Sequence, residues 1–218
     1  MEPLFTERGV FVALEGGEGA GKSTQARMLG DWLETLGHRV LLTREPGGTD
    51  VGGQLRRIVL DHSTGELSPR TEALLYTADK AEHVDEVVLP ALAEGMVVVT
   101  DRYVDSLLAY QGAGRAVDIT ELEQVARWAT SDLRPHLTVV LDVDPATGLG
   151  RAGDLDRIEV EPLEFHQRVR EHFLALAAAD PTHYLVLPAD GDADTLHQAI
   201  RAGVEPWLAQ AAREKVQP

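Results

Sequence analysis

One eight-residue segment restricts the fold of this chain more than any other feature: residues 16–23 read GGEGAGKS. The segment follows a short apolar run at residues 10–14 and precedes residues whose apolar members recur with the spacing of an α-helix. Glycines at the first and sixth positions, followed directly by Lys22 and Ser23, fit the pattern of a phosphate-binding loop (P-loop) between a strand and a helix. The sequence therefore predicts an α/β fold that carries this loop at the end of a buried strand.

Five short apolar runs predict the strands of the sheet, at residues 10–14, 40–42, 97–99, 137–143 and 184–187. Strands that are apolar throughout are typical of a parallel sheet covered on both faces. Helices are expected at residues 29–36, 51–60, from Ser68 onward, between 103 and about 130, at 162–179 and at 193–209. Because no repeat or linker divides the chain, we expect one three-layer domain over residues 1–218, with helices on both faces of the sheet.

The composition limits the partners. A net charge of -16 argues against nucleic acid or an anionic membrane, because such surfaces bind clustered Lys and Arg. No stretch approaches the ~20 apolar residues of a membrane span. The chain has no cysteine, and its first ten residues lack the pattern of a signal peptide. We therefore expect a cytoplasmic protein whose ligand is a polyanionic small molecule.

The loop indicates how such a ligand is held. Its glycines let consecutive backbone N–H groups turn toward an anion, and the following helix adds its positive N-terminal end. Lys22 is expected to reach the β- and γ-phosphates of ATP, and the Ser23 hydroxyl to bind Mg²⁺. The loop alone leaves GTPases, ATPases and small-molecule kinases open. The predicted ATP-binding residues are Gly16, Gly17, Glu18, Gly19, Ala20, Gly21, Lys22, Ser23 and Thr24.

Asp101 and Arg102 follow the third predicted strand. A carboxylate at a strand end can hold Mg²⁺ together with Ser23, although Asp101 can also serve as the cap of the next helix. Arg102 suits a second phosphate, because two nucleotides that meet phosphate to phosphate need several cations. The eight histidines show no metal-ligand spacing, so we expect His62, His83 and His166 at the surface or in packing.

Segments spread over nearly the whole chain resemble the bacterial-type thymidylate kinases. They are LEGGEGAGKSTQ (14–25), LLTREPGGT (41–49), RTEALLYTADKAEHV (70–84), DRYVDSLLAYQG (101–112), RPHLTVVLDV (134–143) and LDRIEVEPLEFHQRV (155–169). The resemblance implies a P-loop kinase fold and transfer of the γ-phosphoryl group of ATP to dTMP, giving dTDP and ADP, with Mg²⁺ as cofactor. It also implies a mobile lid at about residues 150–161 and, as in many relatives, a homodimer.

The same resemblance implies a dTMP site, in which Arg56 and Arg102 hold the phosphate and Tyr76 stacks on thymine. Glu18 would lie near the sugar and the metal, and Tyr110 against the sugar. Plain alternatives are a solvated helix face for Arg56 and core packing for either tyrosine. The predicted substrate-binding residues are Glu45, Pro46, Arg56, Tyr76, Lys80, Arg102, Ser106, Tyr110 and Gln111.

Three features depart from the family pattern. Lys80 stands where an arginine usually reads the thymine edge, and a point-like ammonium is a poorer planar partner. Leu107 stands where a small polar residue usually faces the base. The lid is short, with Gly153 and Asp154 where relatives often carry arginines.

The short lid bears on catalysis, because relatives without an arginine inside the P-loop generally supply one from the lid. Here Glu18 occupies the P-loop position, so Arg151 is the predicted catalytic and ATP-binding cation, with Arg157 second. Lys22, Arg102 and Glu18 complete the predicted catalytic set. Either lid arginine can instead be a surface charge that pairs with Asp156 or Glu159. Two rival functions remain: a kinase for another pyrimidine nucleotide, and a catalytically weakened nucleotide-binding regulator.

Overall fold

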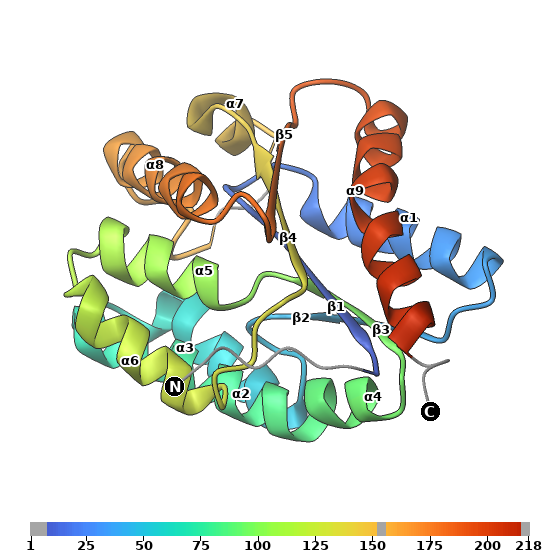
Figure 1. Ribbon diagram of the computed structural model, residues 1–218. Helices are drawn as coiled ribbons and strands as arrows, with labels where there is room; N and C mark the ends of the chain where they lie inside the picture. The colour runs from blue at the N-terminus through green and yellow to red at the C-terminus, as the bar shows by residue number, and fades with distance from the viewer. Residues whose placement is uncertain (1–7, 152–155, 215–218) are drawn as a thin grey trace.

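Five parallel strands form the centre of the protein in a computed structural model that describes residues 8–151 and 156–214 (Figure 1). Their order across the sheet is β2-β3-β1-β4-β5. The predicted five-stranded parallel sheet is therefore confirmed. Because the strands are parallel, the loops that follow β1, β2 and β3 meet at one edge of the sheet. The strands are β1 (Val10–Gly16), β2 (Val40–Arg44), β3 (Val97–Asp101), β4 (Leu137–Asp142) and β5 (Tyr184–Pro188).

Burial differs between the inner and the edge strands. Every residue of β1 and β3 is buried, and so is β4 up to its last residue. In β2 and β5 the side chains are only partly covered, because each strand has a single neighbour in the sheet. The expectation that strands are covered on both faces thus holds for the three inner strands and not for the two at the edges.

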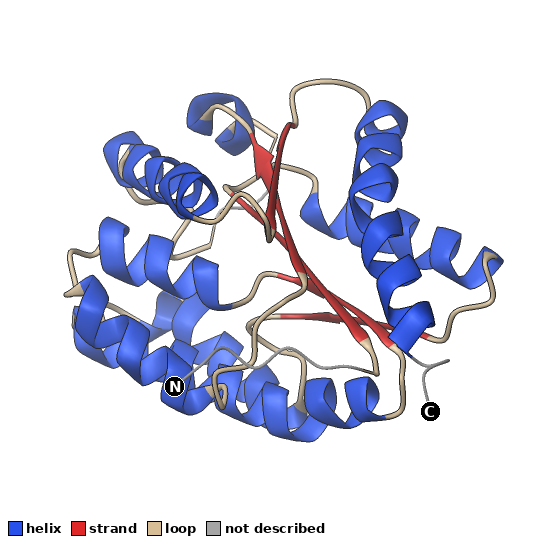
Figure 2. Ribbon diagram, viewed as in Figure 1, coloured by secondary structure: helices blue, strands red, loops and turns tan. Residues whose placement is uncertain are grey.

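Two long helices cover one face of the sheet, α1 (Lys22–Thr35) and α9 (Ala193–Glu214) (Figure 2). Leu29 and Leu33 of α1 and Ile200 of α9 are fully buried in the core that these helices form with the sheet. Helix α1 begins at Lys22, directly after the P-loop, so its free N–H groups point toward that loop. It ends at Thr35, close to the end expected from the sequence, and Gly37 follows with a φ of 84°, the left-handed conformation that commonly follows a helix.

The remaining helices cover the other face and the ends of the sheet (Figure 1). They are α2 (Asp50–Leu60), α3 (Pro69–His83), α4 (Leu89–Ala93), α5 (Val104–Leu107), α6 (Ile119–Ala129), α7 (Pro145–Leu149) and α8 (Leu163–Ala179), with the short 3-10 helix η1 (His62–Thr64) and the π-helical segments η2 (Val84–Val88) and η3 (Leu108–Gly114). Ser68 accepts a hydrogen bond from the backbone N–H of Thr71, so the helix expected from Ser68 onward begins with Ser68 as its cap. Helix α7 was not predicted, although Asp144 caps it and a proline occupies its first turn.

The core on this face places α5 directly behind the P-loop. Phe11 of β1 packs edge to face against Tyr103, with ring centroids 5.0 Å apart. Leu107 of α5 is buried in the same cluster. Helix α8 covers β4, where Phe173 and Val140 share a second cluster. The segment from Arg102 to Tyr110 is therefore packed between the sheet and the helices α3 and α8, beside the P-loop that follows β1.

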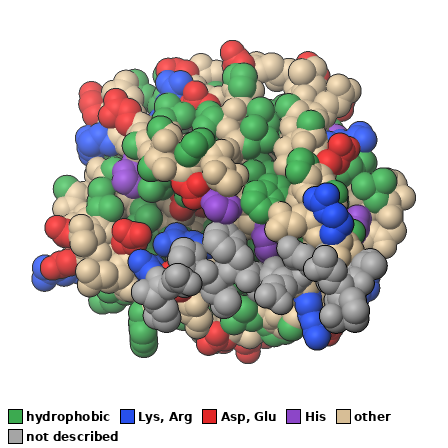
Figure 3. Space-filling model, in the orientation of Figure 1, with side chains coloured by type: hydrophobic (Ala, Val, Ile, Leu, Met, Phe, Trp, Pro, Cys, Tyr) green, Lys and Arg blue, Asp and Glu red, His purple; other side chains and the backbone are tan. Residues whose placement is uncertain are grey.

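Within the described parts of the chain, no helix is long and apolar enough to cross a membrane. On the face shown in Figure 3, acidic and basic side chains are interspersed with apolar ones.

Candidate active site

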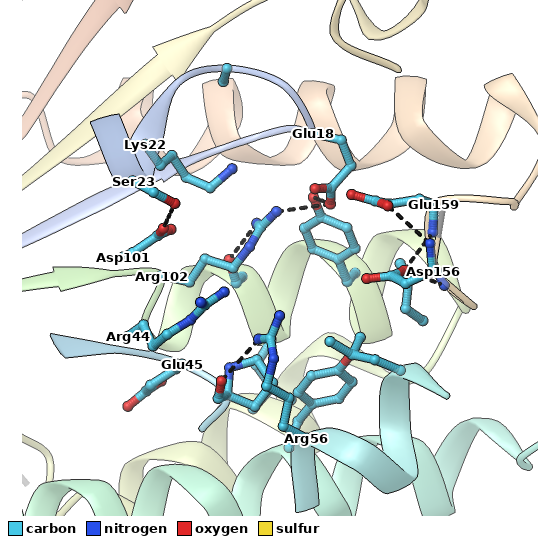
Figure 4. Close-up of a pocket in the computed structure, with 18 of the residues that line it drawn as sticks. Glu18, Lys22, Ser23, Arg44, Glu45, Arg56, Asp101, Arg102, Asp156 and Glu159 are labelled. Carbon is cyan, nitrogen blue, oxygen red and sulfur yellow. Dashed lines mark hydrogen bonds and ion pairs between the residues drawn. The ribbon is translucent and has the colours of Figure 1, made fainter. Parts of the chain in front are cut away.

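A cavity of about 320 Å³ opens at the carboxyl ends of β1, β2 and β3. Its walls come from the P-loop, the segment after β2, helices α2 and α3, the end of β3, and α5 with η3 (Figure 4). Most of the predicted site residues line it: Glu18, Gly19, Ala20, Gly21, Lys22, Ser23, Thr24, Glu45, Pro46, Arg56, Tyr76, Lys80, Asp101, Arg102, Ser106, Tyr110 and Gln111. Gly16, Gly17 and Arg151 do not.

The P-loop wraps around the ammonium group of Lys22. Its Nζ donates to the carbonyl oxygens of Gly16 at 3.1 Å and Gly17 at 2.7 Å. Burial and the charge of nearby Arg102 lower the pKa of Lys22 to about 8. Gly19 has a φ of 63°, and a Cβ atom there would lie 2.0 Å from the Gly148 carbonyl oxygen of α7. A side chain at this position is therefore excluded by both conformation and space.

Ser23 and Asp101 meet across the sheet. The Ser23 hydroxyl donates to a carboxylate oxygen of Asp101, and Asp101 lies opposite Leu14 in the register between β1 and β3. Two oxygen atoms beside the P-loop suit Mg²⁺, which prefers oxygen ligands and keeps several waters. In residues 8–151 and 156–214, no group of three or more His, Cys, Asp or Glu side chains is arranged to hold a metal. Nucleotide phosphate and water would therefore supply the remaining ligands.

Arg102 connects the end of β3 to the P-loop. Its Nη1 donates to the Gly16 carbonyl oxygen at 3.1 Å, and its Nη2 forms an ion pair with Glu18 at 2.8 Å. The guanidinium lies 4.9 Å from the centroid of the Tyr110 ring, and the Tyr110 hydroxyl donates to the same Glu18 oxygen at 2.6 Å. Although burial alone would raise it, the charges of Arg102 and Lys22 lower the pKa of Glu18 to about 2. Glu18 is thus ionised and fixed in place.

Two more arginines face the cavity, from the end of β2 and from α2. Arg56 donates to the Pro46 carbonyl oxygen at 3.0 Å. Arg44, which we did not predict as a site residue, points toward the same space (Figure 4). Neither has an ion-pair partner in the part of the chain that the structure describes, and burial together with the charge of Arg44 lowers the pKa of Arg56. An available sequence signal for Arg44 is its place at the end of a parallel strand, where ligands bind.

A buried polar cluster around Glu45 forms part of the cavity wall. Its carboxylate pairs with Lys80 and, at 2.7 Å, with Nδ1 of His83. The other ring nitrogen of His83 lies 2.7 Å from the hydroxyl of Thr43. The side chains of Lys80 and Glu45 are 3% and 1% exposed. Lys80 therefore lines the cavity with its charge already engaged, and His83, expected only at the surface or in packing, positions a site residue.

A second cluster lies around Glu72 of α3. Gln111 donates to its carboxylate at 3.0 Å, Arg115 pairs with it at 3.1 Å, and Arg157 pairs with its other oxygen. Arg157 also donates to the carbonyl oxygen of Val59 at 2.8 Å and does not line the cavity. The alternative partner for this lid arginine was Asp156 or Glu159. In the structure Arg157 pairs with Glu72 instead, because the segment that contains Arg157 lies alongside α2 and α3.

The described parts of the predicted lid are acidic where they meet the cavity. Asp156, Ile158 and Glu159 line it, and the Glu159 carboxylate points toward Glu18 (Figure 4). Burial, with the charges of neighbouring carboxylates, raises the pKa of Glu159. Residues 152–155 of the predicted lid lie outside the described residues. We did not predict these three, although they belong to the charged stretch assigned to the lid.

Arg151 lies outside the cavity, on the far side of the P-loop. It is exposed at the end of α7, and its Nη1 donates to the carbonyl oxygens of Ala189 at 2.9 Å and Gly19 at 3.4 Å. Its neighbours are therefore backbone carbonyls of the P-loop and of the loop after β5. Among the described residues, the cations that line the cavity are instead Lys22, Lys80 and the arginines at 44, 56 and 102, and Lys80 is already paired with Glu45.

Comparison with known proteins agrees with this geometry. The family model described as thymidylate kinase matches residues 14–200. The chain is similar to a thymidylate kinase of Cutibacterium acnes, with 58% identity over 90% of this chain and 96% of the relative. For a thymidylate kinase of Clavibacter sepedonicus the identity is 50%, over 94% and 98%. A crystal structure of thymidylate kinase from Ehrlichia chaffeensis superimposes with a TM-score of 0.76 at 29% identity, covering 90% of this chain and 98% of that chain. A P-loop, a carboxylate at the end of β3 and a cation-lined second site thus occur in a chain that belongs to the thymidylate kinase family.

Proposed function

We propose that this protein transfers the γ-phosphoryl group of ATP to dTMP, giving dTDP and ADP. The observation that carries the proposal is the pair of arginines at positions 44 and 56, which face the P-loop across one cavity. Each has no ion-pair partner among the described residues, and they lie close enough for Arg44 to lower the pKa of Arg56. Two neighbouring cations of this kind suit a monophosphate dianion beside the triphosphate site.

The transfer needs positioning and charge stabilisation rather than a covalent enzyme intermediate. Lys22 would contact the β- and γ-phosphates, since its ammonium group is already held at the mouth of the loop. Arg102 would bridge the two phosphates, because it reaches the P-loop carbonyl from the end of β3. Ser23 and Asp101 would hold Mg²⁺, which neutralises charge on the phosphates when bound.

The nucleoside would lie deeper, between α3 and η3. Tyr76 of α3 and Tyr110 of η3 both line the cavity and would offer apolar ring faces to the base and the sugar. Leu107 contributes an apolar surface, and Gln111 a polar one that Glu72 orients. Because Lys80 is engaged with Glu45, we infer that the base is held mainly by stacking and by Gln111.

Arg151 is assigned to ATP rather than to the acceptor. Its guanidinium reaches the carbonyl oxygens of the P-loop and of the loop after β5, which lie on the donor side. We infer that residues 150–161 act as a mobile lid of a single domain and that closure brings Arg151 to the triphosphate. Hydrogen exchange of residues 150–161 with and without both nucleotides tests this: protection on binding supports a lid, and unchanged exchange contradicts it.

A panel of nucleoside monophosphates with ATP and Mg²⁺, with ADP release as the readout, tests the function. We expect turnover with dTMP, loss of turnover when EDTA removes the metal, and a large loss for Lys22→Met. Turnover only with another pyrimidine nucleotide would refute the assignment of dTMP. Absence of turnover with every acceptor would favour a nucleotide-binding regulator.

We also infer that two copies associate through α3 and α6. The side chains of Leu74 on α3 and Trp128 on α6 are 60% and 81% exposed, and large apolar side chains left in water favour association. Light scattering on a size-exclusion column is expected to give twice the chain mass, and Trp128→Arg to give a monomer. A wild-type monomer at micromolar concentration would refute the dimer. Residence in the cytoplasm and the absence of a nucleic-acid partner stay predictions.

A further inference from the structure

The backbone of Arg102 is held in an unusual conformation by hydrogen bonds on both sides. Its φ is 74°, in the left-handed region that favours glycine, yet its function requires a guanidinium side chain. The N–H of Arg102 donates to the Leu14 carbonyl oxygen at 2.9 Å. Its carbonyl oxygen accepts from the hydroxyl of the fully buried Thr100 at 2.8 Å. Such a conformation persists only where the surroundings fix it.

The turn that follows Arg102 is fixed by a single carboxylate, that of Glu15. One oxygen accepts from the N–H groups of Tyr103 at 2.8 Å and Ser106 at 3.1 Å. The other oxygen accepts from the Ser106 hydroxyl at 2.6 Å. Glu15 is fully buried and lies one residue before the P-loop. It thus ties the base of the P-loop to the start of α5.

The donor and acceptor roles in this chain of contacts are determined by chemistry. An arginine can only donate, so the Ser106 oxygen, 3.1 Å from Nη1 of Arg102, must accept from it. The single Ser106 proton then goes to Glu15, and Glu15 must be an acceptor at that oxygen. Ionised Glu15 therefore aligns Ser106, which in turn aligns the guanidinium of Arg102.

We propose that Glu15 is a positioning residue for phosphoryl transfer, which aims Arg102 at the phosphates through Ser106 and the turn after β3. This inference rests on the proposed function, because Arg102 is assigned there to the phosphates. Glu15 does not line the cavity that holds the P-loop and the arginines. It faces a different cavity, of about 310 Å³, on the other side of the turn. Its effect on catalysis is therefore exerted through Arg102.

The surroundings of Glu15 make this alignment dependent on pH. Asp105 of α5 is its buried neighbour and accepts from the hydroxyl of Tyr184 of β5 at 2.7 Å. Burial and the charge of Asp105 raise the pKa of Glu15 to about 7, against the lowering effect of Arg102. Arg134 faces the same pair through Asp105, and Lys22 faces Glu15 from α1. Below about pH 7, a proton on one Glu15 oxygen competes with the hydrogen bonds that this carboxylate accepts from Ser106 and from the N–H groups of the turn.

Glu15→Gln and Asp105→Asn form a matched pair, because each removes one buried carboxylate without changing the shape of the side chain. We expect Glu15→Gln to lower kcat by about 10- to 100-fold, the order of loss that a misplaced reacting group produces. Asp105→Asn is expected to stay within about 3-fold of wild type, because the hydrogen bond of the Asp105 side chain is to Tyr184 rather than to Arg102 or Ser106. Melting temperatures identify any loss of fold.

The pH profile distinguishes alignment from simple stability. In the wild type, kcat is expected to rise between pH 6 and 8 as Glu15 ionises. In Glu15→Gln this rise of kcat with pH should disappear. In Asp105→Asn the rise should move to lower pH, because the negative charge of Asp105 no longer repels that of Glu15. Should Glu15→Gln fail to fold, Ser106→Ala removes the link to Arg102 and is expected to lower kcat in the same way.

The outcomes separate the two proposals. Absence of wild-type turnover with dTMP refutes the proposed function. Wild-type turnover together with an unchanged kcat and pH profile in Glu15→Gln, or in Ser106→Ala if that variant is used, refutes only the role of Glu15. Equal losses of kcat in Glu15→Gln and Asp105→Asn, in step with equal losses of melting temperature, also refute it, because they indicate a structural role alone.

Discussion

Lys80→Met removes one half of the buried ion pair beneath the acceptor site and keeps most of the side-chain volume. Glu45 would then remain, 1% exposed, with His83 as its hydrogen-bond partner. Breaking a buried pair on one side costs about 3–5 kcal/mol, because the remaining charge is left without compensation. This cost needs no reduction for screening by solvent, since the side chains of Lys80 and Glu45 are both almost completely buried. With a urea m-value of about 2 kcal/mol/M, the midpoint should fall by about 2 M.

The deficit should depend on pH, because Asp79 lies in the same cluster. Burial and the charge of Glu45 raise the pKa of Asp79 to about 6, whereas Lys80 lowers it. Without Lys80, Glu45 and Asp79 bind protons more readily in the folded state, because their negative charges repel each other. A carboxyl group whose folded pKa is raised loses stability as the pH rises through that pKa, so the deficit of Lys80→Met should be larger at pH 8 than at pH 6.

Urea unfolding followed by fluorescence at pH 6 and 8 measures both effects. Arg39→Met is the matched control, because it breaks an ion pair with Glu94 whose side chains are 61% and 64% exposed. It should cost less than about 1 kcal/mol. The double variant Lys80→Met with Glu45→Gln removes both charges and should recover most of the loss. A Lys80→Met deficit no larger than that of the control, or a double variant less stable than the single one, would refute the reasoning.

Five further substitutions test the P-loop and the lid. Gly19→Ala should lower the melting temperature strongly, whereas Gly17→Ala should not, because only Gly19 combines a positive φ with a carbonyl oxygen 2.0 Å from the added Cβ; equal losses would contradict this. Because the pKa of Glu18 is about 2 in the folded state, against 4.5 as its ordinary value, its stabilisation is complete above about pH 4.5 and is lost as the pH falls toward 2. Glu18→Gln should therefore lower stability by up to about 3 kcal/mol at pH 7 and flatten acid unfolding between these values; an unchanged acid transition would count against it. Arg151→Ala should lower kcat far more than it changes the KM for dTMP, by up to about 10³-fold. Arg157→Ala should instead lower the stability of the fold, because the charge of Arg157 is paired with Glu72. Steady-state kinetics and denaturation of both variants separate a catalytic role from a structural one. An unchanged kcat for Arg151→Ala would rule out a catalytic role for Arg151.

The sequence determined the sheet and the donor side of the site. Apolar runs identified each strand, and the spacing of residues 16–23 placed the phosphate loop between β1 and α1. These features are local, because a strand or a P-loop is specified by neighbouring residues. Asp101 and Arg102 were also predictable, since the carboxyl ends of parallel strands share one edge of a sheet.

Only the tertiary structure decided which charges remain free for a ligand. Lys80 and Arg157 are both cations in candidate segments, but the fold pairs one with Glu45 and the other with Glu72. Arg44 has no such partner among the described residues and faces the cavity. These partners are 35 and 85 positions apart in the chain. A local sequence pattern does not show which residues so far apart in the chain will pair. The sequence therefore identified the candidate cations, and the packing of α3 against its neighbours decided which of them are paired within the fold.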